Sequence, residues 1–129
     1  MTRQNISSGA PWEVQFGYSR AVRIKDRIIV SGTIAVDEAG RLLYPDDPAG
    51  QVGVVFDRIE TAIRSAGGTL QDVVSLRIYI TRMEDAETIG HAFKQRLGNI
   101  NPVATMVAVA ALFADARVEI EAEAAVPSA

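Results

Sequence analysis

Three carboxylates near the end of the chain occupy every second position. Glu119, Glu121 and Glu123 alternate with apolar residues from Val118 onward, which is typical of a strand with one buried and one solvated face. A carboxylate whose pKa is raised by a cleft can take a proton from water. For Glu119 we consider this role as general base, with a solvated strand face as the alternative. For Glu121 and Glu123 we favour the solvated face.

A tyrosine and an arginine stand two residues apart in the first third of the chain. On a strand this spacing places Tyr18 and Arg20 on the same face. Arg20 could then offer a guanidinium to an anionic ligand, and Arg77 is a second candidate for that contact. The alternatives are an ion pair at a surface or interface for Arg20 and simple packing for Tyr18.

Small polar residues interrupt one strand-like run in the first third of the chain. Ser31 and Gly32 break this run, and glycine within a strand often marks a bulge or a close backbone approach. The hydroxyls of Ser31 and Thr105 could donate hydrogen bonds to a ligand carboxylate, although hydroxyls are common on strands.

Composition excludes several kinds of chemistry. The chain has no cysteine and a single histidine, His91, so thiolate catalysis and a typical zinc site are excluded, and we expect no metal or cofactor. A net charge of -3 with no basic cluster argues against a nucleic-acid partner. The N-terminus has no apolar run and no segment is long enough to span a membrane, so we expect a cytoplasmic protein without membrane contact.

The rest of the chain supplies the elements that must position these side chains. Asp47-Pro48 is typical of a helix start, and apolar residues follow at helical spacing as far as Gly67-Gly68. We predict a single domain over residues 1–129, in which residues 1–15 form an irregular N-terminal arm. The predicted strands are 21–24, 28–30, 73–81, 103–112 and 117–126, the predicted helices are 48–66 and 84–97, and a short turn at 114–116 joins the last two strands.

This β-β-α-β-α-β-β order predicts an α+β architecture with two helices on one face of a mixed sheet. The last two strands are apolar on both faces for much of their length, as Met106 and Val107 illustrate. Such strands favour burial against another subunit, and we therefore expect an oligomer.

Five segments in this order resemble the RidA family, also called YjgF or reactive intermediate deaminase proteins and formerly endoribonuclease L-PSP-like proteins. The segments are GYSRAV (17–22), IIVSGT (28–33), AGGTLQDVVSLRIYIT (66–81), NPVATMVAVAALF (101–113) and VEIEAEA (118–124). The resemblance implies a fold similar to chorismate mutase of the small bacterial type. It also implies a homotrimer with a small-molecule ligand cleft between each pair of subunits. Members of the family hydrolyse reactive enamines and imines to keto acids and ammonia without a cofactor.

One position departs from the family pattern. The family has an arginine two residues after the proline of its fourth motif, and that arginine binds the substrate carboxylate. Here the proline is Pro102 and the matching residue is Ala104. Loss of such a charge-assisted contact removes about 1.5–3 kcal/mol of binding.

Other positions agree with the family cleft. The resemblance assigns Tyr18 to the cleft tyrosine, Ser31 and Gly32 to the small polar pair beside the ligand, and Glu119 to the residue that positions the hydrolytic water. Thr105 and Met106 follow Ala104 and are counted among the substrate-binding residues, although the run from Met106 to Leu112 is also typical of core or subunit contact. Arg20 is the candidate that could replace the missing guanidinium.

Three functions are compatible with these residues. The first is a hydrolase of a small enamine or imine, whose usual activity is weakened by Ala104. The second is a non-catalytic protein that binds small metabolites. The third is an endoribonuclease, an activity attributed to some members of the family, which the acidic charge balance disfavours.

Overall fold

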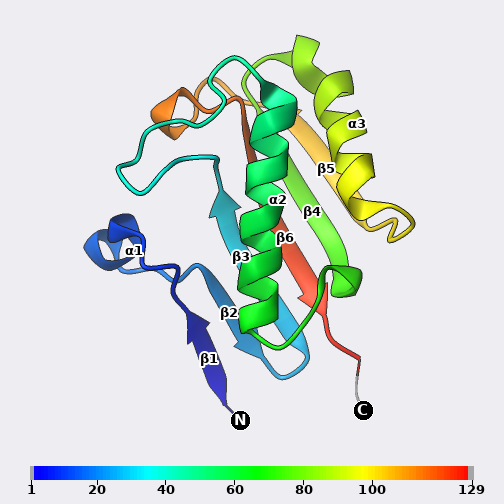
Figure 1. Ribbon diagram of the computed structural model, residues 1–129. Helices are drawn as coiled ribbons and strands as arrows, with labels where there is room; N and C mark the ends of the chain where they lie inside the picture. The colour runs from blue at the N-terminus through cyan, green and yellow to red at the C-terminus, as the bar shows by residue number, and fades with distance from the viewer. Residues whose placement is uncertain (1, 128–129) are drawn as a thin grey trace.

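A six-stranded mixed sheet runs through the molecule, and two long helices cover one of its faces (Figure 1). The computed structural model describes residues 2–127. The strands are β1 (Arg3–Ile6), β2 (Ala21–Ile24), β3 (Arg27–Thr33), β4 (Val73–Ile80), β5 (Val103–Ala108) and β6 (Val118–Ala125), and the α-helices are α1 (Pro11–Phe16), α2 (Pro48–Ser65) and α3 (Ala86–Leu97). The predicted α+β architecture, with two helices on one face of the sheet, is confirmed.

The sheet order is β1-β2-β3-β6-β4-β5. All neighbouring strands are antiparallel except β4 and β5, which are parallel because α3 connects them. The short turn predicted after β5 is the 3-10 turn at Phe113–Asp115. It does not form a hairpin, since β4 lies between β5 and β6.

Local signals explain the long helix α2. The Asp47 carboxylate accepts a hydrogen bond from the Gly50 N–H (2.9 Å), and Pro48 occupies the first helical position. The apolar stripe of α2 is buried against the covered face of the sheet, where each fully buried large side chain stabilises the fold by about 1.5–3 kcal/mol. The centre of this core consists of Val52, Val55, Phe56, Ile59 and Ile63 from α2 with Leu76, Ile78, Ile80, Val118 and Ile120 from the sheet.

The N-terminal residues differ from the prediction of an irregular arm over residues 1–15. Residues Arg3–Ile6 form the edge strand β1, which pairs with β2, and the short helix α1 begins at Pro11. The strand gave no signal in the sequence because an edge strand with exposed faces lacks apolar alternation. The element order therefore begins with an additional strand and helix.

The strand predicted at 103–112 is also shorter than expected. β5 ends at Ala108, and the Val109 N–H makes one further bond to the Ile80 carbonyl (2.8 Å), where its partner β4 ends. β5 is an edge strand on which Val103 and Val107 are exposed and Met106 contacts the core. Within residues 2–127, no helix has the length and apolar character needed to cross a membrane.

Candidate functional site

Glu119 lies on β6 against an irregularity in the neighbouring strand β3. The pairing of the two strands shifts register between Val30 and Thr33, and Gly32 lies in this bulge. A Cβ atom built on Gly32 would be 2.6 Å from Glu119 Oε2. Only glycine at position 32 therefore leaves room for the Glu119 carboxylate in its present place.

The three glutamates of β6 have different surroundings. Glu121 accepts a hydrogen bond from the Tyr79 hydroxyl, and Glu123 pairs with the Arg27 guanidinium. Among residues 2–127, Glu119 has neither a hydrogen bond nor an ion pair to its carboxylate. The side chain favoured as a candidate base is thus the one left without a partner.

The pKa of Glu119 is raised above that of an ordinary glutamate. Partial burial of the carboxylate is the main cause, the negative charge of Glu121 adds to it, and the positive charge of Arg20 opposes it. A half-buried carboxylate with a raised pKa is a stronger proton acceptor than a solvated one, which suits general-base catalysis.

Arg20 immediately precedes β2 and lies close enough to Glu119 for its positive charge to lower the pKa of that carboxyl. Its Nη1 donates to Thr33 Oγ1 (3.3 Å), and its Cζ lies 5.8 Å from the centre of the Tyr18 ring. The side chain is 15% exposed, and its Nε is buried without a hydrogen-bond partner among the described residues. Four of the five N–H donors of the guanidinium therefore have no protein acceptor within residues 2–127.

Two charged residues near Arg20 were not anticipated from the sequence. Glu13 on α1 is buried, and its Oε2 lies 3.7 Å from Arg20 Nε. Arg58 on α2 donates to the Ile34 carbonyl (3.3 Å), and burial followed by the charge of Arg20 lowers its pKa. Neither could be recognised from the sequence, because Glu13 lies in the segment predicted to be irregular and Arg58 is one of several charged residues in the predicted helix 48–66.

The Ser31 hydroxyl is committed to the backbone. Ser31 Oγ donates to the Ser19 carbonyl (2.7 Å), which ties β3 to the segment that carries Tyr18 and Arg20. Thr33 Oγ1 in turn donates to the Ser31 carbonyl (2.8 Å) while accepting from Arg20. Ser31 therefore shapes the site, and its single hydroxyl proton is not free for a ligand in this arrangement.

The predicted residues of β5 do not join this group within one chain. Ala104 is in register with Leu76, and Met106 is in register with Ile78. Both residues therefore lie on the face of the sheet that the helices cover. Thr105 is in register with Arg77 and lies on the open face, as Glu119 does, but β4 separates the two strands. The structure brings together Tyr18, Arg20, Ser31, Gly32 and Glu119, and it leaves Ala104, Thr105 and Met106 apart from them.

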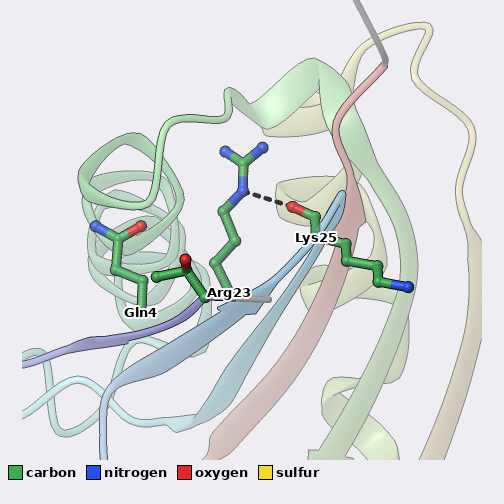
Figure 2. Close-up of a pocket in the computed structure, with 4 residues that line it drawn as sticks. Gln4, Arg23 and Lys25 are labelled. Atoms are coloured by element: carbon green, nitrogen blue, oxygen red, sulfur yellow. Dashed lines mark hydrogen bonds between the residues drawn. The ribbon is translucent and has the colours of Figure 1, made fainter.

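A surface hollow of about 360 Å³ lies near the β2–β3 turn, away from these residues. It is lined by Thr2, Gln4, Arg23 and Lys25 (Figure 2). Arg23 is occupied there, because its Nε donates to the Lys25 carbonyl (2.9 Å) and its Nη1 to the Ala66 carbonyl at the end of α2 (2.7 Å). This hollow is at the opposite end of β2 from Arg20 and contains none of the predicted site residues. Across residues 2–127 there is no cluster of three or more potential metal ligands.

Comparison with known proteins identifies the family and the fold of this chain. The family model described as Endoribonuclease L-PSP matches residues 10–126. A crystal structure from Mycobacterium tuberculosis, described as a member of the YjgF/YER057c/UK114 family, is 43% identical and superposes with a TM-score of 0.88, covering 97% of this chain and 100% of that one.

Two further relatives extend the comparison. The YjgF gene product of E. coli is 27% identical, with a TM-score of 0.82 and coverage of 95% of this chain and 98% of that one. An uncharacterized protein of Streptomyces coelicolor is 36% identical over 121 residues, which are 93% of this chain and 88% of the relative. This protein therefore belongs to the Endoribonuclease L-PSP family, the family of the YjgF, RidA and UK114 proteins.

Proposed function

We propose that this protein is a Rid-type hydrolase of small enamines or imines, in which Glu119 activates water and Arg20 binds an anionic group of the substrate. The observation that carries the proposal is the pairing of two incompletely satisfied charges. The Glu119 carboxylate has no partner within residues 2–127, and the neighbouring Arg20 guanidinium makes a single hydrogen bond. In a substrate that carries an anionic group next to an imine, the anionic group would bind Arg20 and the imine carbon would face the water that Glu119 activates.

The reaction consumes one water and needs no oxidant. In the first step the Glu119 carboxylate takes a proton from water as the hydroxyl oxygen bonds to the imine carbon, and it passes that proton to the nitrogen as the carbon–nitrogen double bond becomes a single bond. In the second step Glu119 takes the hydroxyl proton of the resulting carbinolamine and passes it to the nitrogen as the carbon–nitrogen bond breaks. The products are a keto compound and ammonia, and Glu119 ends as the free carboxylate.

Arg20 takes over a task that position 104 cannot perform. Ala104 has no donor, so a substrate carboxylate must find its counter-charge elsewhere. Arg20 approaches from the β2 side of Glu119 and can form a bidentate contact with a carboxylate through its free N–H groups. We expect the preferred substrates to differ from those of relatives that keep an arginine on β5.

We also propose that the chain forms the homotrimer implied by its resemblance to RidA, with the cleft completed between subunits. Two features support this. The surface hollow shown in Figure 2 contains no site residue, and the edge strand β5 exposes Val103 (69%) and Val107 (42%). Burial of these side chains against a second copy would remove apolar surface from water.

A non-catalytic metabolite-binding protein is the second candidate, and Ala104 is the observation that favours it. Such a protein would keep the cleft and the Arg20 contact without accelerating hydrolysis. The endoribonuclease activity named in the family description is a weaker proposal, because the chain is acidic and has no basic cluster.

A coupled assay distinguishes the two main candidates. An amino acid oxidase generates 2-iminobutanoate in situ, and its loss is followed with and without the purified protein. We expect acceleration by the wild type, a decrease of about 100-fold or more in Glu119→Gln, and near wild-type rates in Glu123→Gln, whose carboxylate is engaged with Arg27. Equal acceleration by the wild type and Glu119→Gln would rule out Glu119 as the base, and no acceleration by the wild type would leave only the binding protein.

A further inference from the structure

The segment before β2 contains a buried carboxylate that the reaction does not use. Glu13 is 4% exposed, and it accepts hydrogen bonds from Ser7 Oγ (3.1 Å), the Ser8 N–H (3.0 Å) and the Ser8 hydroxyl. A buried carboxylate is expensive unless it is hydrogen-bonded, and these contacts offset that cost. They also fix the carboxylate in one position.

The fixed carboxylate faces the candidate anion-binding arginine. Glu13 Oε2 lies 3.7 Å from Arg20 Nε, and on another edge of the guanidinium Nη1 donates to Thr33 Oγ1. The planar guanidinium is thus held on two sides, by charge and by a hydrogen bond. Its remaining donors are left for another acceptor.

The same residue anchors Tyr18 through its backbone. The Glu13 carbonyl accepts hydrogen bonds from the Gly17 N–H (2.9 Å) and the Tyr18 N–H (3.0 Å) at the end of α1. Gly17 has the left-handed conformation that this helix end requires (φ 75°). Both Tyr18 and Arg20 are therefore oriented by contacts with Glu13.

We propose that Glu13 is a positioning residue, whose buried carboxylate, held by Ser7 and Ser8, orients the Arg20 guanidinium toward the anionic group of the substrate. This inference rests on the proposed function of Arg20. The N-terminal segment then contributes to the site by holding Arg20 in its binding orientation. Without it, Arg20 is a long side chain that must be ordered each time a ligand binds.

The effect on affinity follows from that ordering cost. Immobilising one rotamer-rich side chain on binding weakens affinity by about two- to tenfold. Loss of Glu13's charge should therefore raise the dissociation constant for an anionic ligand by this factor. It should also let Arg20 move away from Glu119.

The movement of Arg20 away from Glu119 can be detected independently of activity, through the pKa of Glu119. The titratable and charged groups facing Glu119 are Glu121 from β6, Arg20 from the segment before β2, and Tyr79 from β4, whose hydroxyl is bound to Glu121. Arg20 lowers the pKa of Glu119. Removing the negative charge of Glu13 would by itself lower the pKa of Glu119, so a rise in that pKa on changing Glu13 reports a displaced Arg20.

The test compares the wild type with Glu13→Gln, which keeps an acceptor oxygen for Ser7 and Ser8 but removes the charge. Glu38→Gln, in an exposed loop, is the control. Binding of the reaction product 2-oxobutanoate is measured by calorimetry, and the pKa of Glu119 by ¹³C NMR with Glu119→Gln used for assignment. The ¹⁵N signal of Arg20 Nε reports directly on the order of the guanidinium.

We expect a two- to tenfold weaker affinity, a higher pKa of Glu119 and a more mobile Arg20 signal in Glu13→Gln, with none of these changes in Glu38→Gln. The double variant Ser7→Ala/Ser8→Ala should show smaller changes of the same sign, and it decides the question if Glu13→Gln does not fold. A folded variant in which the pKa and the Arg20 signal are unchanged overturns the inference. If the wild type does not bind 2-oxobutanoate, the proposed function of Arg20 fails, while the two NMR measurements still decide whether Glu13 orients Arg20.

Discussion

At the scale of single residues, the site depends on one carboxylate that differs from its neighbours. Glu119, Glu121 and Glu123 are identical in type and spacing, but two of them are engaged with Tyr79 and Arg27. Partial burial and the charge of Glu121 raise the pKa of Glu119, and Arg20 limits the rise. The pKa of Glu119 is therefore set by its partial burial and by two charged side chains, Glu121 on β6 and Arg20 before β2.

The proposed replacement of an anion contact at position 104 by Arg20 is the other residue-scale feature. Ala104 is in register with Leu76, away from the face on which Glu119 lies, and it has no polar side-chain atom. Arg20 instead has a guanidinium that lies near Glu13 and, within residues 2–127, makes a single hydrogen bond, to Thr33. Substrate selection in this protein is expected to follow the position of Arg20.

At the scale of elements, the contact between β3 and β6 determines where Glu119 lies. The bulge between Val30 and Thr33 lets Gly32 approach the Glu119 side chain more closely than regular pairing would allow. The Ser31–Ser19 hydrogen bond joins the same bulge to the segment carrying Tyr18 and Arg20. The bulge thus links the candidate base and the candidate anion contact.

The substitution Gly32→Ala tests this role of the bulge. The added methyl group would lie 2.6 Å from Glu119 Oε2, and the flexible end of the glutamate must move to accommodate it. We expect the fold to persist by circular dichroism while the rate of imine hydrolysis falls by about tenfold to 100-fold, since small misplacements of catalytic groups are costly.

The control for this substitution is Gly53→Ala on α2. A Cβ at Gly53 meets nothing within 4 Å, so it should leave activity unchanged and stabilise the helix by about 0.5–1 kcal/mol. Wild-type activity in Gly32→Ala would show that the position of the Glu119 carboxylate is unimportant for the reaction.

At the scale of the whole molecule, the sheet has one face covered by α2 and α3 and one face without helices (Figure 1). The uncovered face carries the β6 glutamates together with exposed apolar side chains such as Ile29 and Val107. We expect this surface and the β5 edge to meet other copies of the chain.

Light scattering coupled to size exclusion tests the assembly. The homotrimer predicts a mass three times the 13.9 kDa of the chain across a range of protein concentrations. Burial of the exposed apolar side chains supplies the driving force. A mass of 13.9 kDa at all concentrations would contradict the trimer and would require the site to function within one chain.

Much of the fold could be predicted because its signals are local. Asp47-Pro48 and the apolar stripe after it specify α2 without reference to the rest of the chain. β1 could not be predicted, since Arg3–Ile6 becomes a strand only by pairing with β2. The pairing of β6 between β3 and β4 likewise depends on distant contacts, and neighbouring positions in sequence do not reveal it.

The candidate site was predictable in part for the same reason. Tyr18, Arg20, Gly32 and Glu119 were chosen from strand spacing and from the family resemblance, and the structure brings them together. Glu13 could not be chosen, because its burial arises from the folding of the N-terminal segment over it. Ala104, Thr105 and Met106 stand apart in a single chain, and their proposed contribution depends on a second subunit.

The central claim, that Glu119 is the base and that Arg20 and Glu121 tune it, is tested most directly by the pH dependence of kcat/KM for imine hydrolysis. The base must be deprotonated to act, so the rate should rise with pH through the raised pKa of Glu119. The uncatalysed loss of imine is subtracted at each pH.

Two variants should move this rise in opposite directions. Arg20→Gln removes the charge that lowers the pKa of Glu119, so the rise should shift to higher pH. Glu121→Gln removes a charge that raises the pKa, so the rise should shift to lower pH. A rise that stays in place in both variants, or that moves in the reverse directions, would contradict the assignment of Glu119 as the base.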